Sequence, residues 1–179
     1  MTNIMTEPTP ECRLESGAQL VPVGLELNRS VFFSGDESYD EQESKASSSR
    51  FMDRNVWRER AESGLLLISY SQDGTAGGFC LSYPKSSPTT KDDCWHIWLV
   101  GVLKGARRNG HWKAMLQATI QHAKNHGFST VSISTFPDKF PAMFASLQKN
   151  NFCVDQSSLR GGSGGGKVFL KLNIQDSIL

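Results

Sequence analysis

The chain has 179 residues, with 19 basic and 18 acidic side chains and four cysteines. This length suits one domain, which we place at residues 11–175 behind a flexible N-terminal tail, residues 1–10. The balanced charge argues against a general nucleic-acid surface, the cysteines form no Cys-x-x-Cys pair, and no apolar run resembles a signal peptide or a bilayer span. We therefore expect no nucleic acid, metal or membrane as a partner, and a cytoplasmic location.

Helical periodicity marks two segments near the N-terminus. Apolar residues recur at helical spacing from Gln19 to Phe32, and again from Phe51 until Gly64 ends the pattern. Between them, residues 34–49 are polar and acidic, so they cannot bury enough apolar surface to offset the entropy cost of ordering. We predict two helices joined by a mobile acidic loop, which either attracts a cationic amine or is ordinary solvated surface.

Three strands are predicted to follow. Leu65–Ser71 and Ala76–Tyr83 flank an Asp-Gly pair within Gln72–Thr75, which is typical of a tight hairpin because glycine accepts a positive φ. The glycines at 77 and 78 are consistent with a bulge. Cys94–Leu103 is apolar at nearly every position, as expected for a central strand covered on both faces.

A basic turn separates this third strand from a helix. The turn comprises Arg107, Arg108, Asn109 and Gly110, and the apolar stripe of the helix runs on until His126 and Gly127 end it. Free backbone N–H groups, the positive end of the helix dipole and two guanidinium groups can converge there on one anion. We predict a site for a phosphorylated cofactor, the alternative being that the arginines are ordinary solvated charges.

The C-terminal part continues the α/β order. Serines alternate with apolar residues over Thr130–Thr135, which predicts a strand, and Pro141–Asn150 has helical spacing. Two closing strands are predicted at Phe152–Val154 and Val168–Leu172. The glycine-rich residues 157–166 between them form a hairpin loop, in which glycine supplies flexibility rather than a phosphate site because no helix follows.

The basic turn also fits a family signature: Arg or Gln, two residues, Gly, one residue, then Gly or Ala. Arg107-Arg-Asn-Gly110-His-Trp112 follows it up to the last position, and Val100-Gly-Val102 precedes it. On these residues, the region from Trp95 to about Leu172 resembles the GCN5-related N-acetyltransferase (GNAT) superfamily, and the upstream order of helices and strands fits its N-terminal half. The resemblance implies an α/β fold with a central mixed sheet of about six to seven strands, about four flanking helices, and acetyl-CoA as cosubstrate.

The same resemblance implies a cofactor site. In the family, the strand corresponding to Val100, Val102 and Leu103 pairs through its backbone with the pantetheine arm of acetyl-CoA. The following turn holds the pyrophosphate, and the matching residues here are Arg107, Arg108, Asn109, Gly110, His111 and Trp112.

Three positions depart from the family pattern. Trp112 stands where a small residue is usual, so it either crowds the phosphate site or points into the core. Leu147 stands where many members have a tyrosine that protonates the leaving thiolate, and Asn151 stands where glycine commonly precedes phenylalanine. Ser146, beside Leu147, is a candidate thiolate donor, the alternative being an ordinary helix serine.

Candidate residues for the acceptor side lie on the apolar strand and after the next one. By strand alternation His96 shares a face with Trp98, at a position from which some family members deploy a general base. A histidine with a pKa near ~6.5 can take a proton from an ammonium group through water; the alternative is a hydrogen-bonded histidine with a purely structural role. Trp98 and Phe136 are candidates to line an acceptor pocket, although aromatic residues in such positions are most often core.

We therefore expect an acyltransferase that moves an acetyl or short acyl group from acetyl-CoA to a primary amine, by direct attack within a ternary complex. Alignment of amine and thioester can supply much of the acceleration, so the absence of the usual tyrosine weakens the reaction without forbidding it. The acceptor is expected to be a small molecule, and the protein a monomer or homodimer. The alternative, motivated by Trp112 and Leu147, is a catalytically inactive module of the same fold that binds CoA or another protein.

Overall fold

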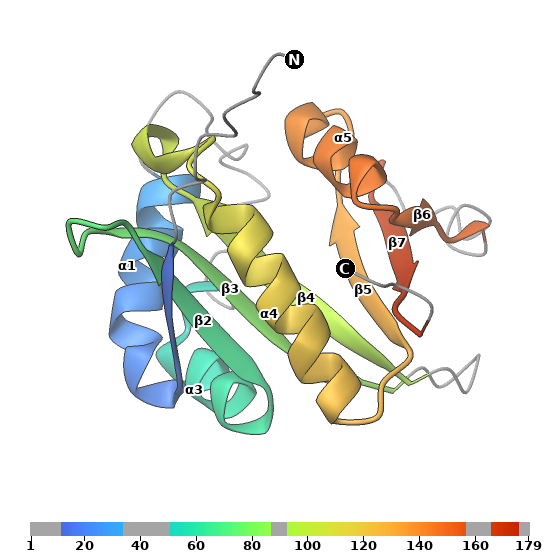
Figure 1. Cartoon of the computed structure of the whole chain (residues 1–179), viewed down its shortest axis with the longest axis horizontal. Helices are drawn as coiled ribbons and strands as arrows, with labels where there is room; N and C mark the ends of the chain where they lie inside the picture. Colours follow the sequence, from blue (N-terminus) through green and yellow to red (C-terminus); the bar gives the residue numbers. More distant parts are fainter. Residues whose placement is uncertain (1–11, 34–50, 87–92, 157–165, 176–179) are drawn as a thin grey trace, which may run out of the picture. The chain divides into compact units, whose positions relative to one another are not determined.

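The computed structural model describes residues 12–33, 51–86, 93–156 and 166–175. The predicted tail (1–10), the acidic loop (34–49) and most of the glycine-rich loop (157–166) lie outside the described residues. The main elements in chain order are β1 (Arg13–Ser16), α1 (Val21–Phe32), α3 (Arg54–Ser63), β2 (Leu65–Tyr70), β3 (Ala76–Lys85), β4 (Cys94–Val102), α4 (His111–Asn125), β5 (Thr130–Thr135), α5 (Pro141–Lys149), β6 (Cys153–Val154) and β7 (Val168–Asn173) (Figure 1). Among these described helices, none combines the length and apolar character that crossing a bilayer requires.

The strands form a mixed sheet in the order β1-β2-β3-β4-β5-β7-β6. β4 runs parallel to β5, whereas β1 pairs antiparallel with β2, and β7 pairs antiparallel with both β5 and β6. In the β4–β5 register His96 lies opposite Ser132. Within the described part of the chain, seven strands with helices α1, α3, α4 and α5 confirm the predicted α/β architecture.

Strand β1 is the element that the sequence pattern does not predict. It is four residues long, Arg-Leu-Glu-Ser, and has a single apolar side chain, Leu14, so no alternation can be recognised. Its backbone pairs with β2, with Arg13 opposite Tyr70 and Ser16 opposite Leu67. The strand therefore owes its conformation to the edge of β2 rather than to its own side chains.

The second predicted helix is interrupted near its start. Phe51 and Met52 are helical as predicted, but Asp53 leaves the helical conformation and caps α3, which runs from Arg54 to Ser63. The Asp53 carboxylate accepts hydrogen bonds from the backbone N–H groups of Asn55 and Val56, at 2.8 and 3.4 Å, and Asp53 itself has extended backbone. A side-chain cap of this kind satisfies N–H groups that the first turn of a helix leaves unpaired.

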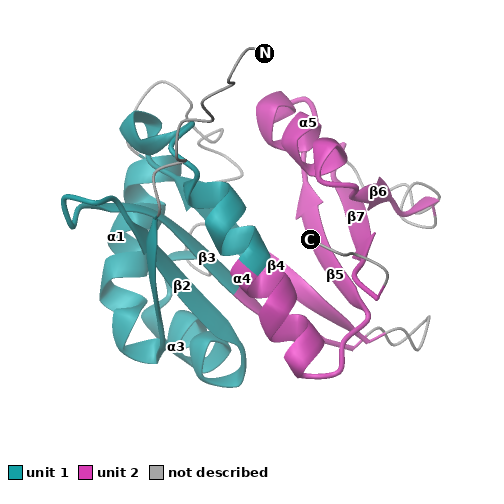
Figure 2. Cartoon of the chain, viewed as in Figure 1, with its two compact units in different colours: residues 1–81, 99–117 teal, residues 82–98, 118–179 magenta. Residues whose placement is uncertain are grey.

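The chain divides into two compact units (Figure 2). Unit 1 comprises residues 1–81 and 99–117, and within it α1 and α3 pack against β2 and against each other. Trp57, Phe79 and Met115 are fully buried in its core, and burial of such side chains contributes about 1.5–3 kcal/mol each. Gly24 allows α1 to approach the indole of Trp57, since an added Cβ would lie 2.6 Å from Trp57 Cζ3.

Unit 2 comprises residues 82–98 and 118–179. Its core includes Ile97, Leu147 and Leu170, all fully buried. The indole of Trp95 donates a hydrogen bond to Ser82 Oγ at 2.8 Å and is likewise buried. The assignment of residues 11–175 to one domain stays a prediction.

Candidate functional site

The basic turn of unit 1 begins where β4 ends, and backbone contacts fix its entry. Leu103 N–H donates to the carbonyl of Gly77 on β3 at 2.9 Å. One turn of 3-10 helix, Lys104–Ala106, follows, and Arg107 returns to extended backbone with φ −62° and ψ 150°. The Arg107 guanidinium reaches back along the chain to the carbonyl of Val102, from Nε at 3.4 Å.

Two left-handed residues turn the backbone toward α4. Arg108 has a φ of 69° and Gly110 a φ of 84°. Ala114 N–H donates to the Gly110 carbonyl at 3.0 Å, which closes the first turn of the helix. Helix geometry leaves the N–H groups of residues 111–113 without acceptors inside the helix, and partial positive charge gathers there. This geometry is favourable for binding a phosphate group.

Along the sequence, the charge around the turn has one sign. The sequence contains no aspartate or glutamate between Asp93 and Asp138. In that interval four cationic side chains gather at the turn and the first helical turn, and all are exposed: Lys104, Arg107, Arg108 and Lys113. Guanidinium groups form bidentate, charge-assisted bonds with phosphate oxygens, so the residues present fit a pyrophosphate.

Cys12, just before β1, contacts the turn at Asn109. Its thiol donates a hydrogen bond to the carbonyl of Asn109, with Sγ 3.2 Å from the oxygen. Burial raises the pKa of the Cys12 thiol, so the thiol keeps its hydrogen and remains a donor. The carbonyl of Asn109 is thereby directed to the protein, which is the orientation that a site for an anion needs.

The imidazole of His111 points into unit 1 and anchors the start of α4. It is 1 % exposed, with Nδ1 2.9 Å from Ser69 Oγ and Nε2 3.2 Å from Ser71 Oγ. Burial lowers the pKa of His111 below its ordinary value, so the ring stays neutral at physiological pH. Only the backbone of His111 is therefore available to the predicted cofactor site. Its side chain anchors the start of the helix to two serines.

Gly77 provides the space that the His111 ring occupies. A Cβ at position 77 would lie 2.5 Å from His111 Cε1 and 2.6 Å from Nε2, closer than any side chain tolerates. We expect Gly77→Ala to displace the ring, to break its bonds to Ser69 and Ser71, and to lower the free energy of unfolding by about 2–3 kcal/mol. Chemical denaturation measures this loss. Gly105→Ala is the matched control, because a Cβ there meets nothing within 4 Å; equal stability of the two variants would contradict the anchoring role.

Trp112 is half-buried, and its indole nitrogen lies out of reach of solvent. Nε1 is buried and has no hydrogen-bond partner. A buried donor without an acceptor costs about 1–3 kcal/mol, and phenylalanine has no such donor. Trp112→Phe is therefore expected to leave the free energy of unfolding unchanged or to raise it by about 1 kcal/mol, as measured by thermal denaturation. A loss of more than 1 kcal/mol would show that the indole N–H is paired in solution.

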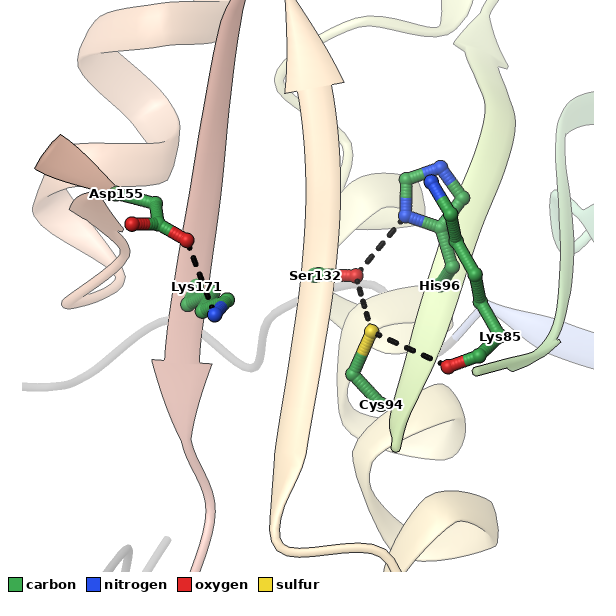
Figure 3. Close-up of polar contacts among 6 residues, drawn as sticks. All are labelled: Lys85, Cys94, His96, Ser132, Asp155 and Lys171. Atoms are coloured by element: carbon green, nitrogen blue, oxygen red, sulfur yellow. Dashed lines mark hydrogen bonds and ion pairs between the residues drawn. The ribbon is translucent and has the colours of Figure 1, made fainter. Parts of the chain in front are cut away.

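In unit 2, His96 belongs to a buried polar cluster (Figure 3). Its Nδ1 lies 2.9 Å from Ser132 Oγ, and the same hydroxyl lies 3.1 Å from Cys94 Sγ. Cys94 in turn donates to the Lys85 carbonyl, 3.8 Å away. His96 is 5 % exposed and Ser132 is fully buried, so the hydrogen bond between them is shielded from water.

Aromatic rings fix the orientation of the His96 imidazole. The Phe169 ring stacks on it at 5.8 Å between centroids with an interplanar angle of 16°, and the Tyr83 ring meets it edge-on at 5.9 Å. The ammonium groups of Lys85 and Lys171 lie 5.4 and 5.9 Å from the centroid of Phe169. Lys171 is also paired with Asp155 at 3.0 Å, so one of these two cations is neutralised (Figure 3).

The remaining predicted residues of unit 2 are spread over several elements. Trp98 on β4 and Phe136 after β5 are half-buried, and the Phe136 ring has the ammonium groups of Lys139 and Lys167 at 5.3 and 5.9 Å. Ser146 on α5 is half-buried, and its carbonyl accepts two hydrogen bonds from Asn150.

Two of the departures from the family pattern are resolved by their surroundings. Leu147, next to Ser146, is fully buried, so its side chain serves the core of unit 2. Asn151 adopts a φ of 64°, a left-handed conformation that asparagine tolerates better than most residues. Asparagine there meets the conformational demand that glycine would otherwise meet.

The predicted residues fall into two groups. The backbone and turn residues from Val100 to Trp112 lie in unit 1, whereas His96, Trp98, Phe136 and Ser146 lie in unit 2. Sequence reasoning missed the hydroxyl partners of the two histidines: Ser69, Ser71 and Ser132. Serine inside an otherwise apolar strand was the available signal, since a buried hydroxyl needs a partner.

Comparisons with known proteins agree with this fold. The acetyltransferase (GNAT) family model matches residues 30–146. PaiA N-acetyltransferase from Thermoplasma acidophilum, solved with coenzyme A, has a TM-score of 0.68 at 13 % identity, with 90 % of this chain and 99 % of that one covered. A putative GNAT acetyltransferase from Desulfovibrio desulfuricans has a TM-score of 0.66 at 12 % identity, covering 92 % of this chain and 99 % of that one. The GNAT protein YhbS from Escherichia coli, also solved with CoA, has a TM-score of 0.61 at 15 % identity, covering 96 % of this chain and 86 % of that one.

Comparison with curated proteins gives no match by sequence. The three solved structures, all below 25 % identity, establish the fold, and the family model establishes the family because it spans more than half of the chain. The chain belongs to the acetyltransferase (GNAT) family.

Proposed function

We propose that this protein is an acetyl-CoA-dependent N-acyltransferase that acylates a small primary amine by direct attack within a ternary complex. The observation that carries the proposal is the turn at residues 104–113. Two left-handed residues, the first N–H groups of α4 and four exposed cations come together in this stretch of the sequence, which contains no acidic residue. The CoA present in two of the structures of similar fold supports the choice of cosubstrate.

The turn and the end of β4 would hold acetyl-CoA between them. Arg107 and Arg108 pair with pyrophosphate oxygens, while the backbone N–H groups of residues 110–113 donate to the same anion. The β4 backbone at Val100–Leu103 offers peptide groups to the pantetheine arm. When bound, acetyl-CoA supplies an acyl group activated as a thioester; the protein supplies alignment, which can account for a large part of the acceleration.

His96 is the residue we propose as general base. An amine arrives protonated at neutral pH and must lose a proton before it attacks, and a histidine whose ring is held in place can accept that proton through water. Ser146 is the proposed thiolate donor because the buried Leu147 beside it has no proton to give. Trp98 and Phe136 are proposed to contact the acceptor.

Two measurements test the proposal independently. Calorimetry with acetyl-CoA and with CoA reports binding, and a thiol-release assay over a panel of primary amines reports turnover. We expect micromolar binding of both nucleotides and thiol release with at least one small amine. Absence of CoA binding would refute the proposal. Micromolar binding without turnover on a broad panel would favour the second candidate, a CoA-binding module without activity, which the apolar Leu147 motivates.

A further inference from the structure

A chain of three hydrogen bonds joins His96 to a backbone carbonyl of β3 (Figure 3). It runs from His96 Nδ1 to Ser132 Oγ at 2.9 Å, from Ser132 Oγ to Cys94 Sγ at 3.1 Å, and from Cys94 Sγ to the Lys85 carbonyl at 3.8 Å. The side chains come from two adjacent parallel strands, β4 and β5, with His96 directly opposite Ser132 in the register. None of the three side chains is more than 5 % exposed, so water does not compete for these bonds.

The contact with the Lys85 carbonyl determines which atom is the donor in each of the three hydrogen bonds. A carbonyl oxygen only accepts, so the contact with Lys85 uses the Cys94 S–H as donor. Cys94 has no second hydrogen, and its sulfur therefore accepts the Ser132 O–H. Ser132 has then used its one hydrogen, and its oxygen accepts from His96. The hydrogen of the neutral imidazole consequently stands on Nδ1.

We propose that Ser132 is a positioning residue that holds His96 in the Nδ1–H tautomer, with Cys94 fixing the direction of the Ser132 hydroxyl. The lone pair of the ring is then on Nε2, the nitrogen that would accept the proton of the acceptor amine. This inference rests on the proposed function, in which His96 is the general base. The tautomer itself is a property of the protein without any substrate, so it can be tested separately.

Two aromatic rings hold the His96 imidazole in place. Phe169 from β7 stacks on one face, and Tyr83 from β3 packs edge-on. Charged groups from the described residues lie beside this cluster: Lys85 from β3 and Lys171 from β7, both over the Phe169 ring, and Asp155, which pairs with Lys171. Stacking restrains rotation of the imidazole, and the hydrogen bond to Ser132 selects which nitrogen carries the hydrogen.

Nuclear magnetic resonance of the full chain labelled with ¹⁵N-histidine tests the tautomer directly. The His96 signals are identified by their loss in His96→Gln. We expect the hydrogen on Nδ1 in the wild type, and a change toward Nε2 in Ser132→Ala. Cys94→Ala is expected to mix the two tautomers, whereas Cys94→Ser keeps both a donor and an acceptor and restores the wild-type signals. A wild-type hydrogen on Nε2 overturns the proposal, as does a Ser132→Ala protein with unchanged tautomer.

Kinetics supply the second readout, with Ser82→Ala as the matched control. Ser82 is also a fully buried serine of unit 2, but it accepts a hydrogen bond from the Trp95 indole. Ser132→Ala is expected to lower kcat by about tenfold with the KM for acetyl-CoA unchanged, and Cys94→Ser to retain the wild-type kcat. Ser82→Ala should change neither kcat nor the His96 signals. If the wild type shows no turnover, the proposed function fails while the tautomer result still stands; if turnover is intact and Ser132→Ala equals the control, this inference fails alone.

Discussion

Replacing Arg107 by alanine and Arg108 by glycine is expected to weaken CoA binding by a hundredfold or more. Each guanidinium that bonds to a phosphate contributes about 1.5–3 kcal/mol, so losing both costs roughly 3 kcal/mol at least, and 1.4 kcal/mol is a tenfold change in Kd. Glycine is chosen at 108 because it accepts the φ of 69° without strain, so the backbone can keep its conformation when the guanidinium is removed. Titration calorimetry with CoA measures the Kd.

Lys149→Ala is the control for the loss of positive charge. Lys149 is exposed in the last turn of α5, in unit 2. The control should bind CoA as the wild type does, and the wild type should lose affinity more steeply with salt than the double variant, because it makes more phosphate contacts. A double variant with wild-type affinity would place the pyrophosphate elsewhere.

His96→Gln is expected to reduce kcat by about 10²–10⁴-fold, the range that a positioned general base contributes, while leaving the Kd for CoA unchanged. Glutamine has nearly the size of histidine and keeps a hydrogen-bonding side chain opposite Ser132, but it cannot take up a proton. The rate profile should therefore lose its acidic limb. Stopped assays of thiol release between pH 5 and 9 measure both effects.

His126→Gln is the control for His96→Gln, because it removes a histidine outside the proposed site. His126 is exposed after α4, also in unit 2, and its ring stacks on that of His122 with centroids 4.1 Å apart. It should keep the wild-type rate and profile. Should His96→Gln also keep them, His96 has only the structural role that its burial and its bond to Ser132 allow.

Elements with their own sequence periodicity could be predicted closely. The strand at Thr130–Thr135 matches β5 to the residue, because apolar positions alternate with serines and a proline follows. The turn before α4 was found because glycine and two arginines follow an apolar strand. β1 could not be found, since its conformation depends on the edge of β2, which is distant in sequence.

The partners of the two histidines show why the site could be predicted only in part. His111 and Ser69 are 42 residues apart, and His96 and Ser132 are 36 apart. The sequence shows that both histidines sit beside apolar residues, which suggests burial, but strand register decides which hydroxyl each one meets. The prediction of His111 as a cofactor residue therefore concerned its backbone position, whereas the use of its side chain as an anchor is known only from the fold.

At Arg108 the stability of the protein and its affinity for the nucleotide favour different residues. A residue with a Cβ loses about 1 kcal/mol of stability when it adopts a φ of 69°, whereas glycine adopts this conformation without strain. In a library selected only for resistance to heat, glycine should accumulate at position 108, and the selected proteins would lose part of their hold on the nucleotide. Efforts to make this protein more robust should therefore keep residue 108 fixed and look for stability elsewhere in the chain.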